Sequence, residues 1–191
     1  MKIVLASNNE HKLKEFKKIL KDYEVVSLSD IGFTDDIEET GSTFLENALL
    51  KANAIRDFLG TNNKSIIIAD DSGLCVDSIG GEPGIYSARY SGEHGNSRLN
   101  REKLIKNLQG KDRKAYFLCM IVVLYPDGNY KSFEGKTYGN IIDEERGNTG
   151  FGYDSIFLSD DLGKTFGEAT EEEKNSVSHR GRAIEKMLKE L

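Results

Sequence analysis

The feature that most constrains the fold is a short apolar run with two acidic residues directly after it. Ser65 to Ala69 contains three consecutive isoleucines, and Asp70-Asp71-Ser72-Gly73 follow. A continuous β-branched run without polar alternation is typical of a strand that is buried on both faces, as the central strands of α/β sheets are. The run therefore predicts a central strand whose end carries polar chemistry.

Strand and helix patterns alternate on either side of this run. Two short strands are expected at residues 2–6 and 23–27. Thr43 and Glu46 have the spacing of a capping box at the start of a long helix. Apolar residues at helical spacing predict four helices, with stripes formed by Leu13, Phe16, Ile19 and Leu20, by Phe44, Ala48, Ala52, Ile55 and Leu59, by Leu99, Leu104 and Leu108, and by Val177, Ile184, Leu188 and Leu191.

A strong turn signal lies in the second half of the chain. Pro126-Asp127-Gly128-Asn129 separates residues 114–124 from residues 130–137, which predicts an antiparallel hairpin that forms part of a second lobe. Strands interleaved with helices indicate an α/β protein. We therefore expect a central mixed, twisted sheet with helices on both faces.

Composition restricts the function classes. The 191 residues fit one globular domain or two closely packed lobes. A net charge of −6 argues against general nucleic-acid binding, which needs a basic surface, but not against a small phosphorylated ligand. No apolar run is long enough for a signal peptide or a membrane span, so a cytoplasmic location is expected. Cys75 and Cys119 lack metal-ligand spacing and are expected to be buried free thiols.

The first strand-to-helix turn has the chemistry of a phosphate site. The amides at the start of a helix and the positive end of its dipole attract anions, and Lys12 adds a full positive charge. The alternative is that Asn8 or Asn9 only caps the helix and that Lys12 is solvated. No Walker A or GxGxxG pattern is present. The residues of this turn are Ser7, Asn8, Asn9, Glu10, His11 and Lys12.

Carboxylates form the second group of candidates. Asp70 and Asp71 can bind a hard cation while one of them acts as a base toward water. Because consecutive strand residues point to opposite faces, only one of the two is expected to face the site. A purely structural turn would use the same residue types. Glu38 and Glu39, in an acidic loop at residues 30–41, are candidates to complete a magnesium site, although most acidic loop residues are only solvated.

Lys51 and a glycine-bracketed pair of aromatics are further candidates. Lys51 lies at the edge of an apolar stripe, where a charge needs either a partner or a path to solvent. Gly150-Phe151-Gly152-Tyr153-Asp154 lets a ring stack on a flat base, unless both rings belong to the core of a tight turn.

Cationic side chains gather around the start of the last helix. Lys174 precedes this helix, and His179 and Arg180 open it, where donors can meet an electron-rich partner. Zinc binding by His179 is not supported, because His11 and His94 do not have the spacing of a ligand set with it.

Taken in order, these motifs resemble the inosine triphosphate pyrophosphatase family, whose members are also known as Ham1-like or RdgB-like house-cleaning nucleotidases. The resemblance spans almost the entire chain. It rests on Ser7-x-Asn9-x-x-Lys12, on Glu38-Glu39-Thr40-Gly41 with Thr43-Phe44-x-Glu46-Asn47-Ala48, on Ala69-Asp70-Asp71-Ser72-Gly73-Leu74, on Gly81-x-Pro83-Gly84-x-Tyr86-Ser87-Ala88-Arg89-Tyr90, on Gly150-Phe151-Gly152-Tyr153-Asp154, and on Ser178-His179-Arg180-Gly181.

The resemblance implies an activity and an assembly. Such enzymes cleave inosine, xanthosine and deoxyinosine triphosphates (ITP, XTP and dITP) between the α and β phosphates, which removes deaminated purines from the nucleotide pool. The implied fold is one ITPase-like domain over residues 1–191, with two lobes, an active site in the cleft between them, and assembly as a homodimer.

The resemblance also implies residue roles. Magnesium would be bound by Glu39 and Asp71, and Asp71 would accept the proton of the attacking water, with Lys12 as the second catalytic residue. The triphosphate would contact residues 7–12 and Lys51. The rest of the substrate would contact Ser72, Phe151, Gly152, Tyr153, Asp154, Lys174, His179 and Arg180, with Phe151 stacked on the base.

Base selectivity is the least determined part of this interpretation. A 6-keto purine presents an oxygen acceptor where adenine presents an amine, so Lys174 and Arg180 can favour hypoxanthine or xanthine. Guanine has the same keto group, and the sequence does not show how GTP is rejected. Ser155 departs from the family pattern, which has proline at this point, and is expected to make the loop less rigid.

Two other functions are alternatives at this point. A Maf-like nucleotide pyrophosphatase combines a similar phosphate turn with acidic residues, but Gly150 to Asp154 and Ser178 to Arg180 argue against it. A nucleotide-binding sensor that had lost catalysis is the other alternative. The intact set of Lys12, Glu39 and Asp71 argues against that loss.

Overall fold

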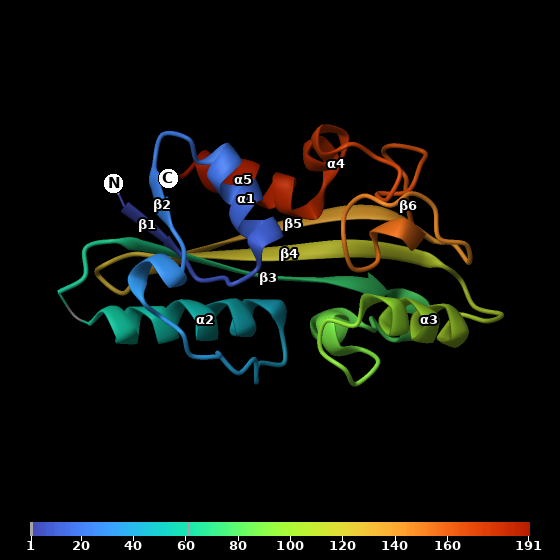
Figure 1. The fold of residues 1–191 in the computed structure, drawn as a ribbon, viewed down its shortest axis with the longest axis horizontal. Helices are drawn as coiled ribbons and strands as arrows, with labels where there is room; N and C mark the ends of the chain where they lie inside the picture. The colour runs from blue at the N-terminus through green and yellow to red at the C-terminus, as the bar shows by residue number, and fades with distance from the viewer. Residues whose placement is uncertain (1, 61) are drawn as a thin grey trace. The chain divides into compact units, whose positions relative to one another are not determined.

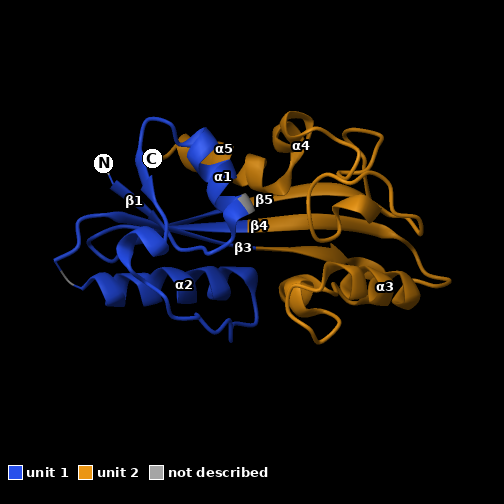
Figure 2. Ribbon diagram, in the orientation of Figure 1, with its two compact units in different colours: residues 1–71, 120–133 blue, residues 72–119, 134–191 orange. Residues whose placement is uncertain are grey.

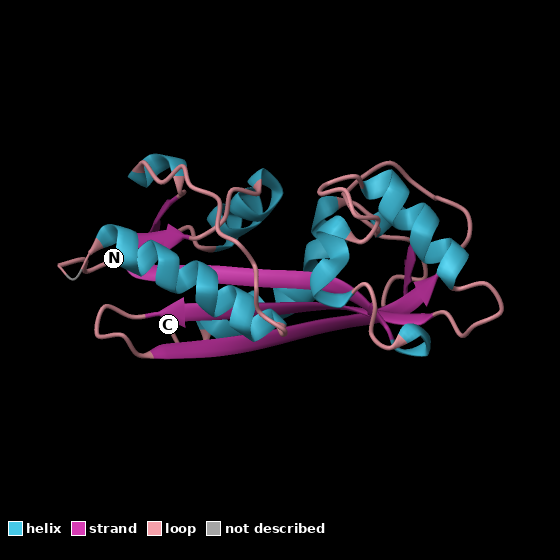
Figure 3. Cartoon of the chain, turned by 90° about the horizontal axis from the view of Figure 1, so that it is seen from below, coloured by secondary structure: helices cyan, strands magenta, loops and turns pink. Residues whose placement is uncertain are grey.

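The computed structural model describes residues 2–60 and 62–191, and for His11 it describes the backbone alone. Helices and strands are interleaved along the chain, with β4, β5 and β6 in succession and α4 followed by α5 (Figure 1, Figure 3). The strands are β1 (Lys2–Leu5), β2 (Glu24–Val26), β3 (Ile66–Val76), β4 (Lys114–Leu124), β5 (Tyr130–Ile141) and β6 (Phe157–Ser159). The α-helices are α1 (Glu10–Ile19), α2 (Phe44–Leu59), α3 (Ser97–Asn107), α4 (Glu171–Val177) and α5 (His179–Leu188).

The strands form one mixed sheet in the order β2-β1-β3-β4-β5-β6. Strand β1 pairs in parallel with β2 and β3, with Val4 opposite both Val26 and Ile67. Strands β5 and β6 are antiparallel, with Asn140 opposite Leu158. The predicted mixed α/β sheet is therefore confirmed.

The chain divides into two compact units (Figure 2). Unit 1 comprises residues 1–71 and 120–133, and unit 2 comprises residues 72–119 and 134–191. Strands β3, β4 and β5 each contribute residues to both units. The hairpin expected in a second lobe is thus divided, because its tip belongs to unit 1.

Each unit has its own apolar core. In unit 1, α1 and α2 lie on opposite faces of the strands (Figure 1). The unit 1 core joins α2 to the strands through Val4, Ala6, Leu28, Phe33, Ala48, Ala52, Ile55, Ile67, Ala69, Val122 and Leu124. The unit 2 core gathers Leu74, Val76, Tyr90, Leu104, Leu108, Ala115, Phe117, Ile141, Tyr153, Ile156, Phe157 and Phe166.

The central strand extends further than its sequence pattern predicts. Strand β3 continues through Asp70 and Asp71 to Val76, so the expectation that it ends at Ala69 is wrong, and so is the alternative of an Asp-Asp-Ser-Gly turn. Leu74 and Val76 continue the buried pattern beyond the two charges. The strand tolerates the aspartates because each is paired with a lysine, as described below.

Two other local expectations need correction. The last helix, expected at residues 177–191, is α5, which begins only at His179, because Ser178 is extended, with ψ of 154°, and its side chain caps α5 by accepting the N–H of Gly181. Val177 instead ends α4, a helix that the sequence patterns did not predict. Thr43 caps α2 as expected, but Glu46 accepts the N–H of Ser42 instead of completing the capping box.

The structure also shows the state of the two cysteines and the character of the helices. Cys75 and Cys119 are buried free thiols, as expected. None of the helices described in the chain is both long enough and apolar enough to cross a membrane.

Gly135 on β5 lets α5 pack directly against the sheet in unit 2. A Cβ at this position would collide with the His179 carbonyl and the Ala183 amide. Gly135→Ala should therefore lower the free energy of unfolding by about 2 kcal/mol, since overpacking in a tight contact typically costs that much. Urea unfolding followed by circular dichroism measures the change. Ser132→Ala on the exposed part of the same strand is the control, and an equal effect of both substitutions would contradict the prediction.

Candidate functional site

Two lysines and three carboxylates of unit 1 form a cluster of alternating charge. Lys12 on α1 pairs with Asp70, at 2.9 Å between Nζ and Oδ2. Lys51 on α2 lies 2.8 Å from Glu39 Oε1 and 3.5 Å from Asp71 Oδ1. Because side chains alternate along β3, the adjacent aspartates meet lysines from different helices. We call Lys12, Glu39, Lys51, Asp70 and Asp71 the charge cluster.

Burial and charge act in opposite directions on this cluster. Burial raises the pKa of Asp71, and Glu39 adds to the rise, while Lys51, Lys12 and a hydrogen bond from Asn47 oppose it. Burial alone would lower the pKa of Lys51, but the carboxylates of Asp71, Asp70 and Glu39 raise it overall. Lys51 therefore stays protonated, while Asp71 accepts a proton more readily than an exposed carboxylate does.

The predicted phosphate turn lies at the start of α1. Asn9 caps the helix, because its Oδ1 accepts the N–H of Lys12 at 3.2 Å, and Ser7 Oγ accepts the N–H of Asn9 at 3.2 Å. Capping by an asparagine is confirmed, but the Lys12 side chain is only 14% exposed and is paired instead of solvated. Asn8 and Glu10 complete the turn, and the side chain of His11 lies outside the described residues.

The charge cluster has the donor set of a divalent cation site. Glu39 and Asp71 each turn an oxygen toward the Lys51 ammonium, so two carboxylates already converge on one positive charge, whereas Glu38 is exposed. Magnesium sites in nucleotide enzymes use one or two carboxylates together with water and substrate phosphates. Within residues 2–60 and 62–191 no group of three or more His, Cys, Asp or Glu side chains could hold a metal. Glu39 and Asp71 are the carboxylates of the charge cluster that share one cation, and a two-carboxylate site suits Mg²⁺ that arrives with a phosphate ligand.

The second cluster lies in unit 2 and is organised by Asp154. Its Oδ2 accepts the N–H of Phe151 at 2.8 Å, and the same oxygen lies 2.8 Å from Lys174 Nζ. A side chain on Gly150 would collide with that oxygen, so the glycine permits the close approach. One buried carboxylate therefore fixes both the aromatic loop, residues 147–154, and the lysine on α4.

Lys174, His179 and Arg180 take different positions in unit 2. The Lys174 ammonium lies 4.9 Å from the centroid of the Phe151 ring, and that ring is 38% exposed. His179 stacks on Phe117, with centroids 4.9 Å apart and an interplanar angle of 14°. Arg180 is buried in the first turn of α5. The exposed Phe151 ring with a cation above it is the part of unit 2 best suited to a flat, electron-rich ligand.

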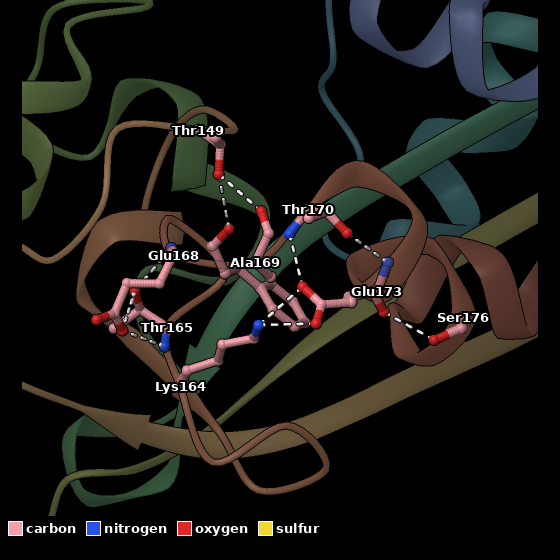
Figure 4. Close-up of polar contacts among 9 residues, drawn as sticks. Thr149, Lys164, Thr165, Glu168, Ala169, Thr170, Glu173 and Ser176 are labelled. Atoms are coloured by element: carbon pink, nitrogen blue, oxygen red, sulfur yellow. Dashed lines mark hydrogen bonds and ion pairs between the residues drawn. The ribbon is translucent and has the colours of Figure 1, made fainter.

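A hydrogen-bond network ties the aromatic loop to the segment before α4 (Figure 4). Thr149 Oγ1 lies 2.7 Å from the carbonyl of Gly167 and 2.9 Å from that of Ala169. Thr170 and Glu173 form a capping box at the start of α4. The segment between the aromatic loop and α4 is thus held by Thr149 at one end and by the capping box at the other. Lys174 on α4 therefore keeps its position relative to the loop.

Ser155 takes part in a second support of the aromatic loop. Its Oγ lies 3.1 Å from Glu145, and Glu145 pairs with Arg101 at 2.9 Å. Arg101 also donates to the carbonyl of Gly152 at 2.7 Å. The Arg101 hydrogen bond lowers the pKa of Glu145, which keeps the pair charged. These bonds act against the loss of rigidity that the missing proline would bring.

The two remaining predicted contacts, Tyr153 and Ser72, differ in burial. Tyr153 belongs to the unit 2 core, and its hydroxyl donates to the Ser87 carbonyl at 2.9 Å. Burial raises the pKa of this hydroxyl well above its usual range. Ser72 is half-buried on β3. Of the two loop aromatics, Phe151 is therefore the exposed one, and Tyr153 is buried in the unit 2 core.

One residue beside the charge cluster was missed by the sequence interpretation. Asn47 on α2 is fully buried, and its Nδ2 lies 3.1 Å from Asp71 Oδ2. A signal for it was present, because Asn47 precedes Lys51 by one helical turn and interrupts the apolar stripe between Phe44 and Ala48. A polar residue on a buried helix face needs a partner.

Comparisons with known proteins cover the whole chain. Residues 3–190 match the family model described as the Ham1 family. A protein of Clostridium perfringens named dITP/XTP pyrophosphatase is 51% identical, with 100% of this chain and 97% of that protein covered. One of the same name from Bacillus subtilis is 48% identical, with 98% and 96% covered.

Solved structures agree with this similarity. The Ham1 protein of Staphylococcus aureus superposes with a TM-score of 0.88 at 46% identity, covering 98% of this chain and 96% of that one. A Mycobacterium abscessus structure titled nucleoside-triphosphatase / dITP/XTP pyrophosphatase gives a TM-score of 0.79 at 38% identity, covering 98% and 97%.

The Lys174–Asp154 pair should matter for stability, because its side chains are only 11% and 5% exposed. Lys174→Met leaves a buried carboxylate without its counter-charge, so the free energy of unfolding should fall by about 3 kcal/mol in urea titrations. Lys164→Met is the matched control, since Lys164 pairs with Glu173 at the same 2.8 Å but in an exposed setting. A loss of stability that is equal in both variants would show that burial of the pair does not decide its energy.

Proposed function

This chain belongs to the Ham1 family, and we propose that it is a nucleoside triphosphate pyrophosphatase. It hydrolyses triphosphates of deaminated purines, namely ITP, dITP and XTP, to the nucleoside monophosphate and pyrophosphate. The names of its relatives, which are about half identical over nearly their full length, support this substrate class.

The observation that carries the proposal is the charge cluster of unit 1. Two lysines are held there by buried carboxylates instead of extending into solvent. A triphosphate can take both lysines as phosphate partners, and the N-terminus of α1 adds amide donors with the positive end of the helix dipole. Residues 7–12 and Lys51 therefore bind the phosphate chain in our proposal.

Glu39 and Asp71 are the residues that would hold Mg²⁺. They fit this ion because their oxygens converge on one cation, Lys51, and because both are hard oxygen ligands. The bound ion would neutralise charge that develops on the phosphate oxygens. With the ion on Glu39, Lys51 would be available to the phosphates.

Asp71 is the proposed base for the attacking water. The water oxygen forms a bond to the α phosphorus, the bond from that phosphorus to the α–β bridging oxygen breaks, and pyrophosphate leaves. Asp71 takes the proton of the water. Lys12 stabilises the negative charge of the phosphates during this step.

The cluster around Asp154 is proposed to bind the base. Phe151 offers an exposed ring for stacking, and one base–aromatic stack contributes about 1–3 kcal/mol. The Lys174 ammonium has three N–H donors and gives one to Asp154, so it can donate another to the oxygen of a 6-keto purine. Ser72, Gly152 and residues 179–180 complete the contacts in this proposal, and Tyr153 anchors the loop in the unit 2 core.

We further propose that the enzyme works in the cytoplasm as a homodimer. The buried free thiols of Cys75 and Cys119 fit a reducing compartment. The dimer follows from the family resemblance alone.

Product analysis tests the reaction. With Mg²⁺ and ITP the protein should release IMP and pyrophosphate in equal amounts, because attack occurs at the α phosphorus. Removal of the metal with EDTA should abolish turnover, and added Mg²⁺ should restore it. IDP and orthophosphate as products would contradict the proposal. A panel of ITP, dITP, XTP, GTP and ATP should show preference for the first three, and equal rates on all five would exclude the house-cleaning role.

Substitution of the base tests the mechanism. Asp71→Asn cannot take the proton, so turnover should fall at least about a hundredfold. Nucleotide binding measured by calorimetry should persist, since Lys12 and Lys51 remain. Asp36→Asn, an exposed residue of the same acidic loop as Glu39, is the charge-matched control and should keep full turnover. Comparable losses in both variants would refute the role of Asp71.

A further inference from the structure

We propose that Asn47 is a positioning residue that holds the loop carrying Glu39 against Asp71, an inference that rests on the proposed function. It touches no substrate. Its amide instead sets the spacing of the two carboxylates that would bind the metal. Without a ligand, Lys51 also contacts both Glu39 and Asp71. As a cation, however, it would be drawn from them to the phosphates of a bound nucleotide.

The amide of Asn47 bridges the two segments directly. Its Oδ1 accepts the backbone N–H of Gly41 at 2.8 Å, two residues from Glu39. Its Nδ2 donates to Asp71 Oδ2 at 3.1 Å. The assignment of the amide atoms follows from chemistry, because the Gly41 N–H can only donate and must face the oxygen, which turns the nitrogen toward the carboxylate.

Helix α2 makes this bridge twice, one turn apart. Lys51 follows Asn47 by four residues and contacts the other oxygen, Asp71 Oδ1, and also Glu39. Both oxygens of Asp71 and both ends of the loop segment from Glu39 to Gly41 are therefore held from one helix. When Lys51 leaves for the phosphates, the neutral and fully buried Asn47 is the bridge that remains.

Gly41 is shaped for this contact. A Cβ at this position would lie 2.6 Å from Asn47 Oδ1 and 2.8 Å from the Glu46 Cβ, which is too close for either neighbour. Its backbone is not in the left-handed region, so an alanine is excluded by crowding and not by strain. The absence of a side chain at Gly41 thus serves the hydrogen bond from the loop to Asn47.

The experiment compares Asn47→Ala, Gly41→Ala and the double variant with the wild type. Binding of Mn²⁺ is measured by electron paramagnetic resonance, with ITP turnover in parallel. Each single variant should bind Mn²⁺ about tenfold or more weakly, as loss of groups that orient metal ligands does. The value of kcat should fall with the metal affinity, while KM for ITP should change less than about threefold, because the lysines and the base contacts are intact.

The double variant tests whether the two residues act as one bridge. If Asn47 acts by holding the loop, the losses in Mn²⁺ affinity should not multiply, and the double variant should resemble Asn47→Ala. Hydrogen exchange gives a readout independent of metal, because the Gly41 amide should exchange faster in Asn47→Ala. Multiplicative losses, or unchanged exchange at Gly41, would overturn the bridge.

Asn100→Ala is the matched control. Asn100 on α3 is also a buried asparagine that binds loop backbone, since it accepts the N–H of Ser91 and donates to the carbonyls of Ser87 and Ala88. It should lower the melting temperature as Asn47→Ala does but leave Mn²⁺ affinity unchanged.

The outcomes separate the two levels of the proposal. A wild type that neither binds Mn²⁺ nor releases pyrophosphate from ITP would overturn the proposed function, and the role of Asn47 with it. A wild type that does both, with Asn47→Ala and Asn100→Ala equal in Mn²⁺ affinity, would overturn the role of Asn47 alone.

Discussion

Two adjacent carboxylates inside strand β3, Asp70 and Asp71, are each paired with a lysine from a different helix. The rest of the candidate site depends on this pairing. Asp70 and Asp71 are nearly inaccessible to solvent, and unpaired charges in such a place would cost several kcal/mol each. Alternation along β3 sends one aspartate toward α1 and the other toward α2. Both helices are therefore fixed to the strand by charge as well as by apolar packing.

The same alternation decides what each aspartate can do. Asp70 is paired with Lys12 at 2.9 Å, so its role is to hold that lysine. Asp71 lies farther from its lysine, at 3.5 Å, and burial raises its pKa. Sequence chemistry alone left the choice of base between the two open. We assign the base to Asp71 in our proposal because it lies farther from its lysine, whereas Asp70 is engaged by Lys12.

Much of the fold was predictable from the sequence, since periodicity reports burial. The buried run at Ser65 to Ala69, the stripe on α2 and the turn at Pro126 to Asn129 were each interpreted correctly. The end of β3 was predicted wrongly, because charged residues usually end a buried strand. Only tertiary pairing with lysines keeps Asp70 and Asp71 inside this one. Helix α4 was also missed, because Val177 is the one large apolar residue in its sequence and no apolar stripe marks it.

The candidate residues were predictable as types, but their partners were not. Lys51 stood out as a charge beside an apolar stripe, and the structure supplies Glu39 and Asp71 as the reason. Asn47 carried the same kind of signal and was overlooked, since an amide is less conspicuous than a charge. Pairings such as Arg101 with Gly152 span 51 residues and leave no local pattern in the sequence.

The balance of charge in unit 1 links metal and nucleotide in the proposed reaction. Two lysines face three carboxylates, so the charge cluster carries one excess negative charge while all five groups are ionised. A free triphosphate is repelled by that excess, and a free divalent cation competes with Lys51 for the same oxygens. In our proposal Glu39 and Asp71 would hold the cation and the lysines would hold the phosphates when both ligands bind. Each ligand would then remove the obstacle to the other, which is positive coupling of their binding free energies.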